Sequence, residues 1–149
     1  LFMKLQILWA SMYGTAEGIA FNLKELAEAK GIETKIHELN EFSVSDLKTL
    51  DNLAVVSSTT GSGDIPANGE LFWSEFEDSS DTLESLNYGV CALGDSSYIT
   101  FCGGGKKINA KLKSLKANEI IECAECDGGD EGSEEWCEAF IDKLLSKIN

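Results

Sequence analysis

Residues 53–68 read LAVV-SSTTGSGDIPAN, and this stretch decides the fold class. Its first four residues are continuously apolar, which is typical of a strand that is covered on both faces of a parallel sheet. The polar part that follows is long, and such loops are uncommon in compact domains unless they are functional. The stretch therefore predicts a ligand-binding loop at the carboxyl end of a central strand.

The same alternation of short apolar runs and helical stripes extends along the whole chain. It predicts an α/β fold: a three-layer sandwich with a five-stranded parallel sheet in order 2-1-3-4-5 and helices on both faces. In such sheets ligands bind outside the carboxyl ends of the strands, which directs attention to the loops at 10–16, 57–68 and 93–105. The whole chain, 1–149, is expected to be one domain. Strands are expected at 4–10, 33–37, 53–56, 89–93 and 120–121, and helices at 15–30, 46–50, 69–77, 106–115 and 133–148.

The composition restricts the classes of partner. With 12 basic and 26 acidic residues the net charge is −14, so nucleic acid and anionic lipid should be repelled and basic partners preferred. The same acidity also suits solubility or salt tolerance alone. No apolar run reaches the ~18–20 residues of a membrane span, and no secretory signal is expected. Five irregularly spaced cysteines favour a reducing cytoplasm. Leu1 and Phe2 precede the first Met and are interpreted as added residues or an unusual start.

Each of the three loops has chemistry of its own. In the first, hydroxyls and Gly14 stand where a helix begins, so free backbone N–H groups there could hold a phosphate, although an ordinary capped turn has the same pattern. In the second, Gly61 and Gly63 permit positive φ. In the third, Tyr98 could stack on a flat ligand, whereas the pattern favours Phe101 as a core residue. Together the loops fit a flat ring system on a monophosphate.

Three segments carry a resemblance to a known family: SMYGTA at 11–16, STTGSGDIP at 58–66, and ALGDSSY at 92–98 continuing to FCG at 101–103. They resemble the FMN-binding segments of the flavodoxin family, most nearly short-chain flavodoxins of the MioC and YqcA type, and they are similar to the FMN domain of diflavin reductases. The resemblance implies a five-stranded flavodoxin-like fold, one non-covalent FMN and a monomeric one-electron carrier. Such a carrier is not an enzyme itself and shuttles electrons from a reductase to an acceptor enzyme.

The resemblance also implies which residues bind FMN. The first segment would hold the phosphate, and the other two would line the two sides of the ring. Tyr98 stands where the family stacks an aromatic residue, and Gly61 where a peptide flips on reduction. The implied binding residues are Ser11, Met12, Tyr13, Gly14, Thr15 and Ala16; Ser58, Thr59, Thr60, Gly61, Ser62 and Gly63; and Leu93, Gly94, Asp95, Tyr98, Phe101 and Cys102.

Two positions depart from the family pattern. Tyr13 stands where many members have Thr, so one hydroxyl contact to the phosphate could be lost or replaced by a phenol. Thr60 stands where some members have Trp, so stacking on the ring could be one-sided. Asp64 and Asp95 would flank the ring and oppose the addition of negative charge to it. The same acidic face would attract a basic reductase or acceptor.

Two other functions remain open. One is an FMN-dependent NAD(P)H oxidoreductase, although no nicotinamide fingerprint is present. The other is a flavin-free binding module on the same fold, although the first strand lacks the acidic cluster of a receiver domain. The Cys123–Cys126 spacing has a minor chance of a redox or metal role. His37 has no evident catalytic partner, and Trp9, Trp73 and Trp136 are expected to pack in the core.

Overall fold

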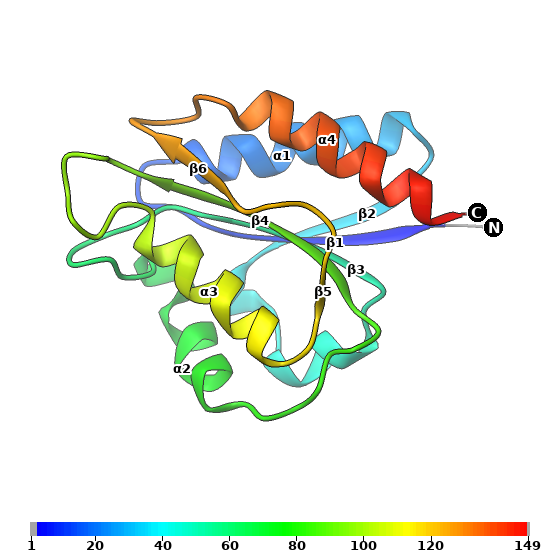
Figure 1. The fold of residues 1–149 in the computed structure, drawn as a ribbon, viewed down its shortest axis with the longest axis horizontal. Coiled ribbons are helices and arrows are strands. Elements are labelled where there is room, and N and C mark those ends of the chain that lie inside the picture. Colours follow the sequence, from blue (N-terminus) through cyan, green and yellow to red (C-terminus); the bar gives the residue numbers. More distant parts are fainter. Residues whose placement is uncertain (1–2, 149) are drawn as a thin grey trace.

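The computed structural model describes residues 3–148, so Leu1 and Phe2 lie outside the described residues. Five parallel strand positions form a central sheet with helices on both faces (Figure 1). The elements are β1 Lys4–Ala10, α1 Thr15–Ala29, β2 Glu33–Glu38, η1 Leu39–Glu41, η2 Val44–Thr49, β3 Asn52–Ser57, η3 Ala67–Gly69, α2 Glu70–Asp78, β4 Asn87–Gly94, α3 Gly103–Ser114, β5 Asn118–Glu119, β6 Ala124–Asp127, α4 Ser133–Leu145 and η4 Ser146–Ile148.

The strand order is β2-β1-β3-β4-β5, with every neighbouring pair parallel, so the predicted order is confirmed. The registers place the ends of β1 and β3 together, because Ala10 pairs with Ser57, and Ser57 in turn pairs with Ala92 of β4. The loops that follow these three strands therefore leave the sheet side by side, at the left end in Figure 1.

The last strand position differs from the prediction. A single strand was expected at 120–121, whereas two short strands, β5 and β6, both pair with β4 on either side of these residues. The pairing register shifts by two residues across the interruption, because Tyr88 pairs with Glu119 whereas Cys91 pairs with Ala124. Ile121 lies in the interruption, and its side chain shares with the Phe140 ring the space that Gly89 leaves open.

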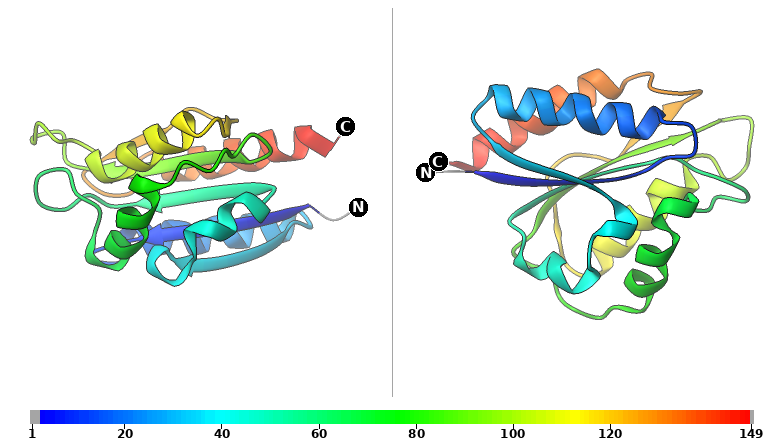
Figure 2. Two further views of the ribbon diagram at one scale, coloured as in Figure 1. Left: turned by 90° about the horizontal axis from the view of Figure 1, so that it is seen from below. Right: turned by 180° about the vertical axis from the view of Figure 1, so that it is seen from behind.

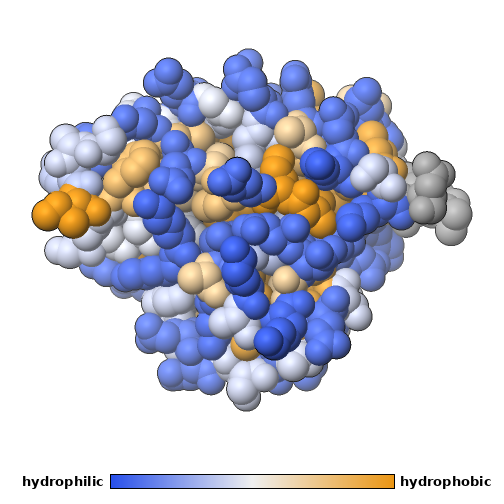
Figure 3. Space-filling model, viewed as in Figure 1, coloured by the Kyte–Doolittle hydropathy of each residue, from blue (hydrophilic) through white to orange (hydrophobic). Residues whose placement is uncertain are grey.

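The core has two parts, one on each face of the sheet, beneath the helices that flank the sheet in the right-hand view of Figure 2. Helices α1 and α4 cover one face and bury Leu23 and Phe140 against β1, β3 and β4. Helices α2 and α3, with η2, cover the other face around Phe76 and Tyr88. The space-filling view shows a mainly hydrophilic surface with an apolar strip near the β5–β6 edge (Figure 3), where Ile120 and Ile121 are only partly buried.

Two helices begin or form differently from the sequence prediction. The helix expected at 46–50 is the 3-10 segment η2. Helix α3 begins at Gly103 and not at Lys106, so three consecutive glycines form its first turn. Close packing overrides their poor helix propensity: a Cβ on Gly104 would lie 2.4 Å from the Ser58 carbonyl oxygen, and one on Gly105 would lie 2.4 Å from Ala92 Cβ. The glycines thus bring α3 against the second loop.

Candidate functional site

The three predicted loops meet at the carboxyl end of the sheet and enclose a cleft of about 160 Å³. The first loop contributes Met12, Tyr13 and Thr15, the second Ser58 and Thr59, and the third Leu93 and Gly94, while Gly129 comes from the loop after β6. Seven of the predicted binding residues therefore line one cleft. The others support or border the loops without lining it.

The first loop leaves the start of α1 open. Gly14 is the N-cap in a left-handed conformation with φ 92°, and no side chain caps the helix. The first helical hydrogen bond runs from Gly18 N–H to the Gly14 carbonyl at 2.9 Å, so the amides of residues 15–17 have no helical acceptor. Ser11 Oγ accepts the Gly14 N–H at 2.9 Å, which keeps its own proton available to a ligand. The turn thus offers several donors at the positive end of a helix dipole.

The second loop is closed by two backbone hydrogen bonds. The amides of Thr60 and Asp64 each donate to the other's carbonyl at 2.8 Å. Gly61 and Gly63 lie between them with φ 52° and 87°, a region that favours glycine. Lys107 of α3 pairs with Asp64 at 3.1 Å, so the carboxylate charge at this loop has a partner. The turn is therefore fixed at its base and exposed at its tip.

Thr59 joins three segments at the floor of the cleft. Its Oγ1 donates to the Leu93 carbonyl at the end of β4 at 2.8 Å and accepts the Gly104 N–H of α3 at 3.1 Å. The hydroxyl is thus used within the protein, although the sequence predicted this residue only as a wall of the cofactor site. Its main effect is to hold the second and third loops in a fixed relation.

The third loop is held by carboxylates. Ser97 donates to Asp95 Oδ1 through both its N–H and its hydroxyl, at 2.9 and 2.7 Å. These bonds hold the pKa of Asp95 below its usual range. Ser96 donates through its N–H and hydroxyl to Asp127, at 2.8 and 2.6 Å, which ties the loop to the end of β6. Tyr98 at the tip is exposed, and so is the neighbouring Ile99.

Three predicted binding residues are buried or half-buried and do not lie in an exposed loop. Ala16 and Cys102 are fully buried, and Cys102 Sγ lies 3.4 Å from the Ala92 carbonyl oxygen. Their side chains therefore face the protein interior. Phe101 is half-buried and belongs to neither part of the core; Lys106 Nζ lies 5.3 Å from the centre of its ring. The alternative interpretation of Phe101 as a core residue is thus wrong.

Three residues at the site were missed by sequence reasoning. Gly129 lines the cleft, Asp127 holds the third loop, and Asn68 Oδ1 accepts the Ser11 N–H at 3.1 Å. A usable signal existed for the first two. The loop after the last strand also leaves the carboxyl edge of the sheet, so the rule that selected the other loops applies to it. Asn68 stands at the end of the quoted polar stretch, but no pattern marks its partner.

Cys123 and Cys126, which have the redox spacing in the sequence, lie in different surroundings. Cys126 is buried beside Cys91, with 3.7 Å between their Sγ atoms, whereas Cys123 is half-buried and its Sγ lies 3.5 Å from the Ala124 carbonyl oxygen. Burial, together with nearby Glu125, raises the pKa of Cys123 to about 12. In this range no disulfide and no group of three or more metal-binding side chains occurs. None of its helices is long and apolar enough to cross a membrane.

The residues present fit FMN. The orphaned amides at the start of α1 suit a phosphate dianion, which needs N–H donors and gains from the helix dipole. The cleft is smaller than the about 300 Å³ minimum for drug-sized ligands, so a three-ring system would be enclosed in part and otherwise exposed. Tyr13 lines the cleft with 90% of its own surface exposed, which leaves an aromatic face free to cover a ring.

Comparison with known proteins agrees with this geometry. Residues 7–140 match the family model described as flavodoxin. Over 148 residues the chain is 36% identical to the sulfite reductase [NADPH] flavoprotein alpha-component of Vibrio parahaemolyticus, covering 98% of this chain and 24% of that protein. The chain thus spans about a quarter of the length of that curated relative.

Solved structures give the same result over the full length of the fold. A single-residue variant of flavodoxin from Pseudomonas aeruginosa has a TM-score of 0.83 and 32% identity, covering 96% of this chain and 99% of the other. The flavodoxin of Streptococcus pneumoniae has a TM-score of 0.85 and 28% identity, covering 97% and 99%. With the family model matching most of its length, the chain belongs to the flavodoxin family, the electron carriers whose cofactor is FMN.

Proposed function

We propose that the chain carries single electrons on FMN from a reductase to an acceptor enzyme and catalyses no substrate reaction of its own. The convergence of three loops on an uncapped helix N-terminus supports this proposal most directly. FMN supplies the redox chemistry, and the protein binds it and controls its surroundings. Neither the NAD(P)H oxidoreductase nor the flavin-free module is favoured by the family match.

The first loop would bind the phosphate through the amides of Thr15 and Ala16 and the hydroxyl of Ser11. The second and third loops would enclose the ring, with Thr59 holding them together. Gly61 would permit the backbone peptide at this position to reorient, since glycine adopts positive φ without strain and the φ of Gly61 is already positive. The proposed binding residues are otherwise those of the three loops as predicted from the sequence.

A basic redox partner would dock over the loops as a transient complex with a monomeric carrier. Around the cleft, Met12, Tyr13, Tyr98 and Ile99 are exposed apolar or aromatic side chains. Asp95 and Asp127 lie among them without an ion-pair partner in residues 3–148. A net charge of −14 would speed encounter with a basic protein at low salt. The five unpaired cysteines suit a reducing compartment such as the cytoplasm.

The proposed function is tested by loading the protein with FMN and titrating it with dithionite without oxygen. We expect stoichiometric binding and reduction in two separate one-electron steps in the visible spectrum. Riboflavin, which lacks the phosphate, should bind at least about tenfold more weakly, because it forgoes several charge-assisted hydrogen bonds. Equal affinity for FMN and riboflavin would contradict the assignment of the phosphate to the start of α1.

Two further measurements separate a carrier from an enzyme. Oxidation of NADH or NADPH by the FMN-loaded protein should not exceed that by the same concentration of free FMN. Electron transfer from the reduced protein to cytochrome c, a basic acceptor, should slow as salt rises, whereas transfer to anionic ferricyanide should not. Turnover of NADPH well above the free-flavin control would favour the oxidoreductase instead.

A further inference from the structure

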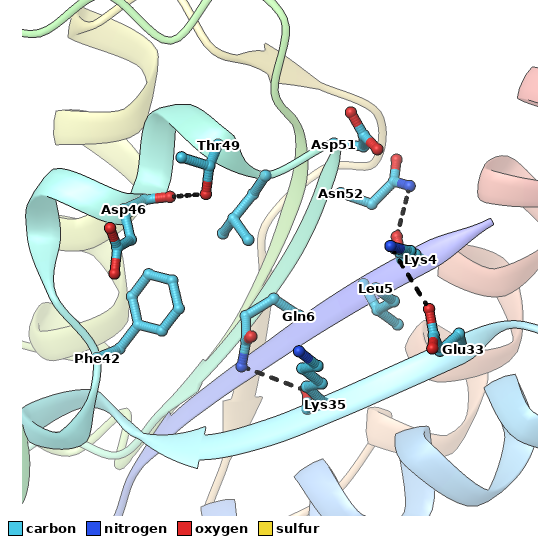
Figure 4. A pocket seen from close by; sticks show the side chains of 11 residues that line it. Lys4, Leu5, Gln6, Glu33, Lys35, Phe42, Asp46, Thr49, Asp51 and Asn52 are labelled. Carbon is cyan, nitrogen blue, oxygen red and sulfur yellow. Dashed lines mark hydrogen bonds and ion pairs between the residues drawn. The ribbon is translucent and has the colours of Figure 1, made fainter. Parts of the chain in front are cut away.

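A second cavity lies at the opposite end of the sheet from the cofactor loops. It has a volume of about 240 Å³ and is formed by the first residues of β1, by β2 and by the segment from Phe42 to Asn52 (Figure 4). None of its lining residues belongs to the predicted cofactor site. The short η2 does not cover this part of the sheet as a full helix would, which leaves the cavity open to solvent.

The walls of this cavity are partly apolar. Phe42 and Leu50 are only half-buried although they are large and apolar, and both line the space above β1. Thr49 contributes little polarity, since its hydroxyl donates to the Asp46 carbonyl at 2.6 Å. Apolar surface left partly exposed in a concave site is the usual basis of small-molecule binding.

One polar atom that faces the cavity has no hydrogen-bond partner within residues 3–148. Gln6 is only 5% exposed, and its Nε2 contacts the carbonyls of Ile7 and Lys35 at 3.1 and 3.4 Å and His37 Nδ1 at 3.0 Å. Two carbonyl acceptors fix the orientation of the amide, because a flipped oxygen would face them. The Oε1 atom accepts no hydrogen bond from residues 3–148 and points toward the cavity (Figure 4).

The charges around the opening select the kind of ligand. Lys4 and Glu33 lie 3.9 Å apart and offset one another. Lys35, Asp46 and Asp51 form no ion pair within residues 3–148, so the lining as a whole is negative by one charge. Both this local charge and the net charge of −14 of the whole protein would disfavour an anionic ligand.

We propose that this cavity binds a small, planar nitrogen heterocycle, neutral or singly positive, with an N–H that donates to Gln6 Oε1 and a ring that packs between Phe42 and Leu50. The bond would engage the side of the Gln6 amide that no group of residues 3–148 uses, while Nε2 keeps its carbonyl acceptors. The volume is below the about 300 Å³ minimum for drug-sized ligands, so the ligand has two fused rings at most.

The test uses the FMN-loaded protein with aminobenzimidazole as the probe and benzoate as the anionic comparison. Amide proton–nitrogen correlation spectra should show saturable shifts at Phe42, Leu50 and the Gln6 side-chain amide. A ligand of this size should have a dissociation constant on the order of 1 mM. Benzoate, which lacks the donor and has the opposite charge, should bind at least about tenfold more weakly.

Two variants examine the two halves of the proposal. Gln6→Leu should weaken aminobenzimidazole about tenfold, the value of one hydrogen bond. Leu50→Trp should fill the cavity and abolish binding without changing Gln6. Asn22→Leu on α1, which covers the other face of the sheet, is the matched control and should bind the probe like the unchanged protein.

Three results would overturn the proposal. They are the absence of saturable shifts up to about 20 mM probe, equal affinity for benzoate, and unchanged binding in Gln6→Leu. Should Gln6→Leu not fold, Leu50→Trp decides the question, because binding that persists with the cavity filled must occur elsewhere. FMN loading leaves this cavity untouched, so failure here would not bear on the proposed electron carrier.

Discussion

Thr59→Val is the substitution with the clearest expected cost. Valine has nearly the same shape, so the change removes one hydroxyl and leaves the Leu93 carbonyl and the Gly104 N–H without their partner. Each bond contributes about 1–1.5 kcal/mol when partly buried. The free energy of unfolding should therefore fall by about 2–3 kcal/mol, and Tm by about 5–10 °C for a domain of this size. Urea unfolding of the protein without FMN measures the first value, and thermal unfolding the second.

The same change should loosen the cofactor site, because Thr59 links the second loop to the end of β4 and to α3. If the competent arrangement of the loops falls to about a tenth of its population, the apparent Kd for FMN rises about tenfold. Thr59→Ser keeps the hydroxyl and should retain most of the stability. Thr82→Val, at an exposed position outside the cleft, should change neither quantity. Stability within 0.5 kcal/mol of the unchanged protein would refute the role assigned to Thr59.

Three further predictions concern other parts of the site. Gly14→Ala should reduce stability by about 1–2 kcal/mol through its φ of 92° alone, since a Cβ there meets no atom within 4 Å. The helical Gly18→Ala, equally free of contacts, should be neutral or stabilising in the same unfolding measurement. Ser97→Ala should raise the pKa of Asp95 toward its usual value, as followed by carbon NMR. Because the pKa of Asp95 is lower in the folded than in the unfolded protein, its charge stabilises the folded state at pH values above the ordinary Asp pKa. This stabilisation is lost as the pH falls through the pKa of the folded protein, so the stability of the variant should depend less on pH in the acid range. An Asp95 pKa that is the same in the variant and the unchanged protein would contradict this role of Ser97. The raised pKa values of Cys102, Cys123 and Cys137, each about 12 through burial, predict slow reaction with Ellman's reagent at pH 8, with half-buried Cys123 reacting first; rapid labelling of several thiols would contradict this.

The strand order could be predicted because it depends on a strong pattern. Runs such as Leu53 to Val56 are apolar without interruption, and β3 is buried along its full length. The stripe in the first helix likewise matches the buried side of α1, which includes Ile19 and Leu23. Once the elements are right, the parallel connections fix where the loops emerge, and the cleft follows from the topology.

The sequence could not show how the loops are held. Glycines usually end helices, so Gly103 to Gly105 were assigned to a loop, whereas contact with Ser58 and Ala92 makes them a helical turn. The pairs Ser96–Asp127 and Ser11–Asn68 join residues far apart in the chain, and no local pattern marks either partner. The split of the last strand reflects two extra residues between Glu119 and Ala124, which no periodic pattern in the sequence marks.

The electrostatics of the site also require the structure. From the sequence, Asp64 and Asp95 count equally as charges that oppose reduction of the cofactor. Lys107 Nζ lies 3.1 Å from Asp64 Oδ1, so the positive charge offsets most of the field that this carboxylate would exert on a bound flavin ring. Asp95 and Asp127 receive only hydrogen bonds from serines, which stabilise their charges without cancelling them. The third loop and the end of β6 therefore carry unpaired negative charge beside the cleft, and the basic partner proposed above should approach from that side.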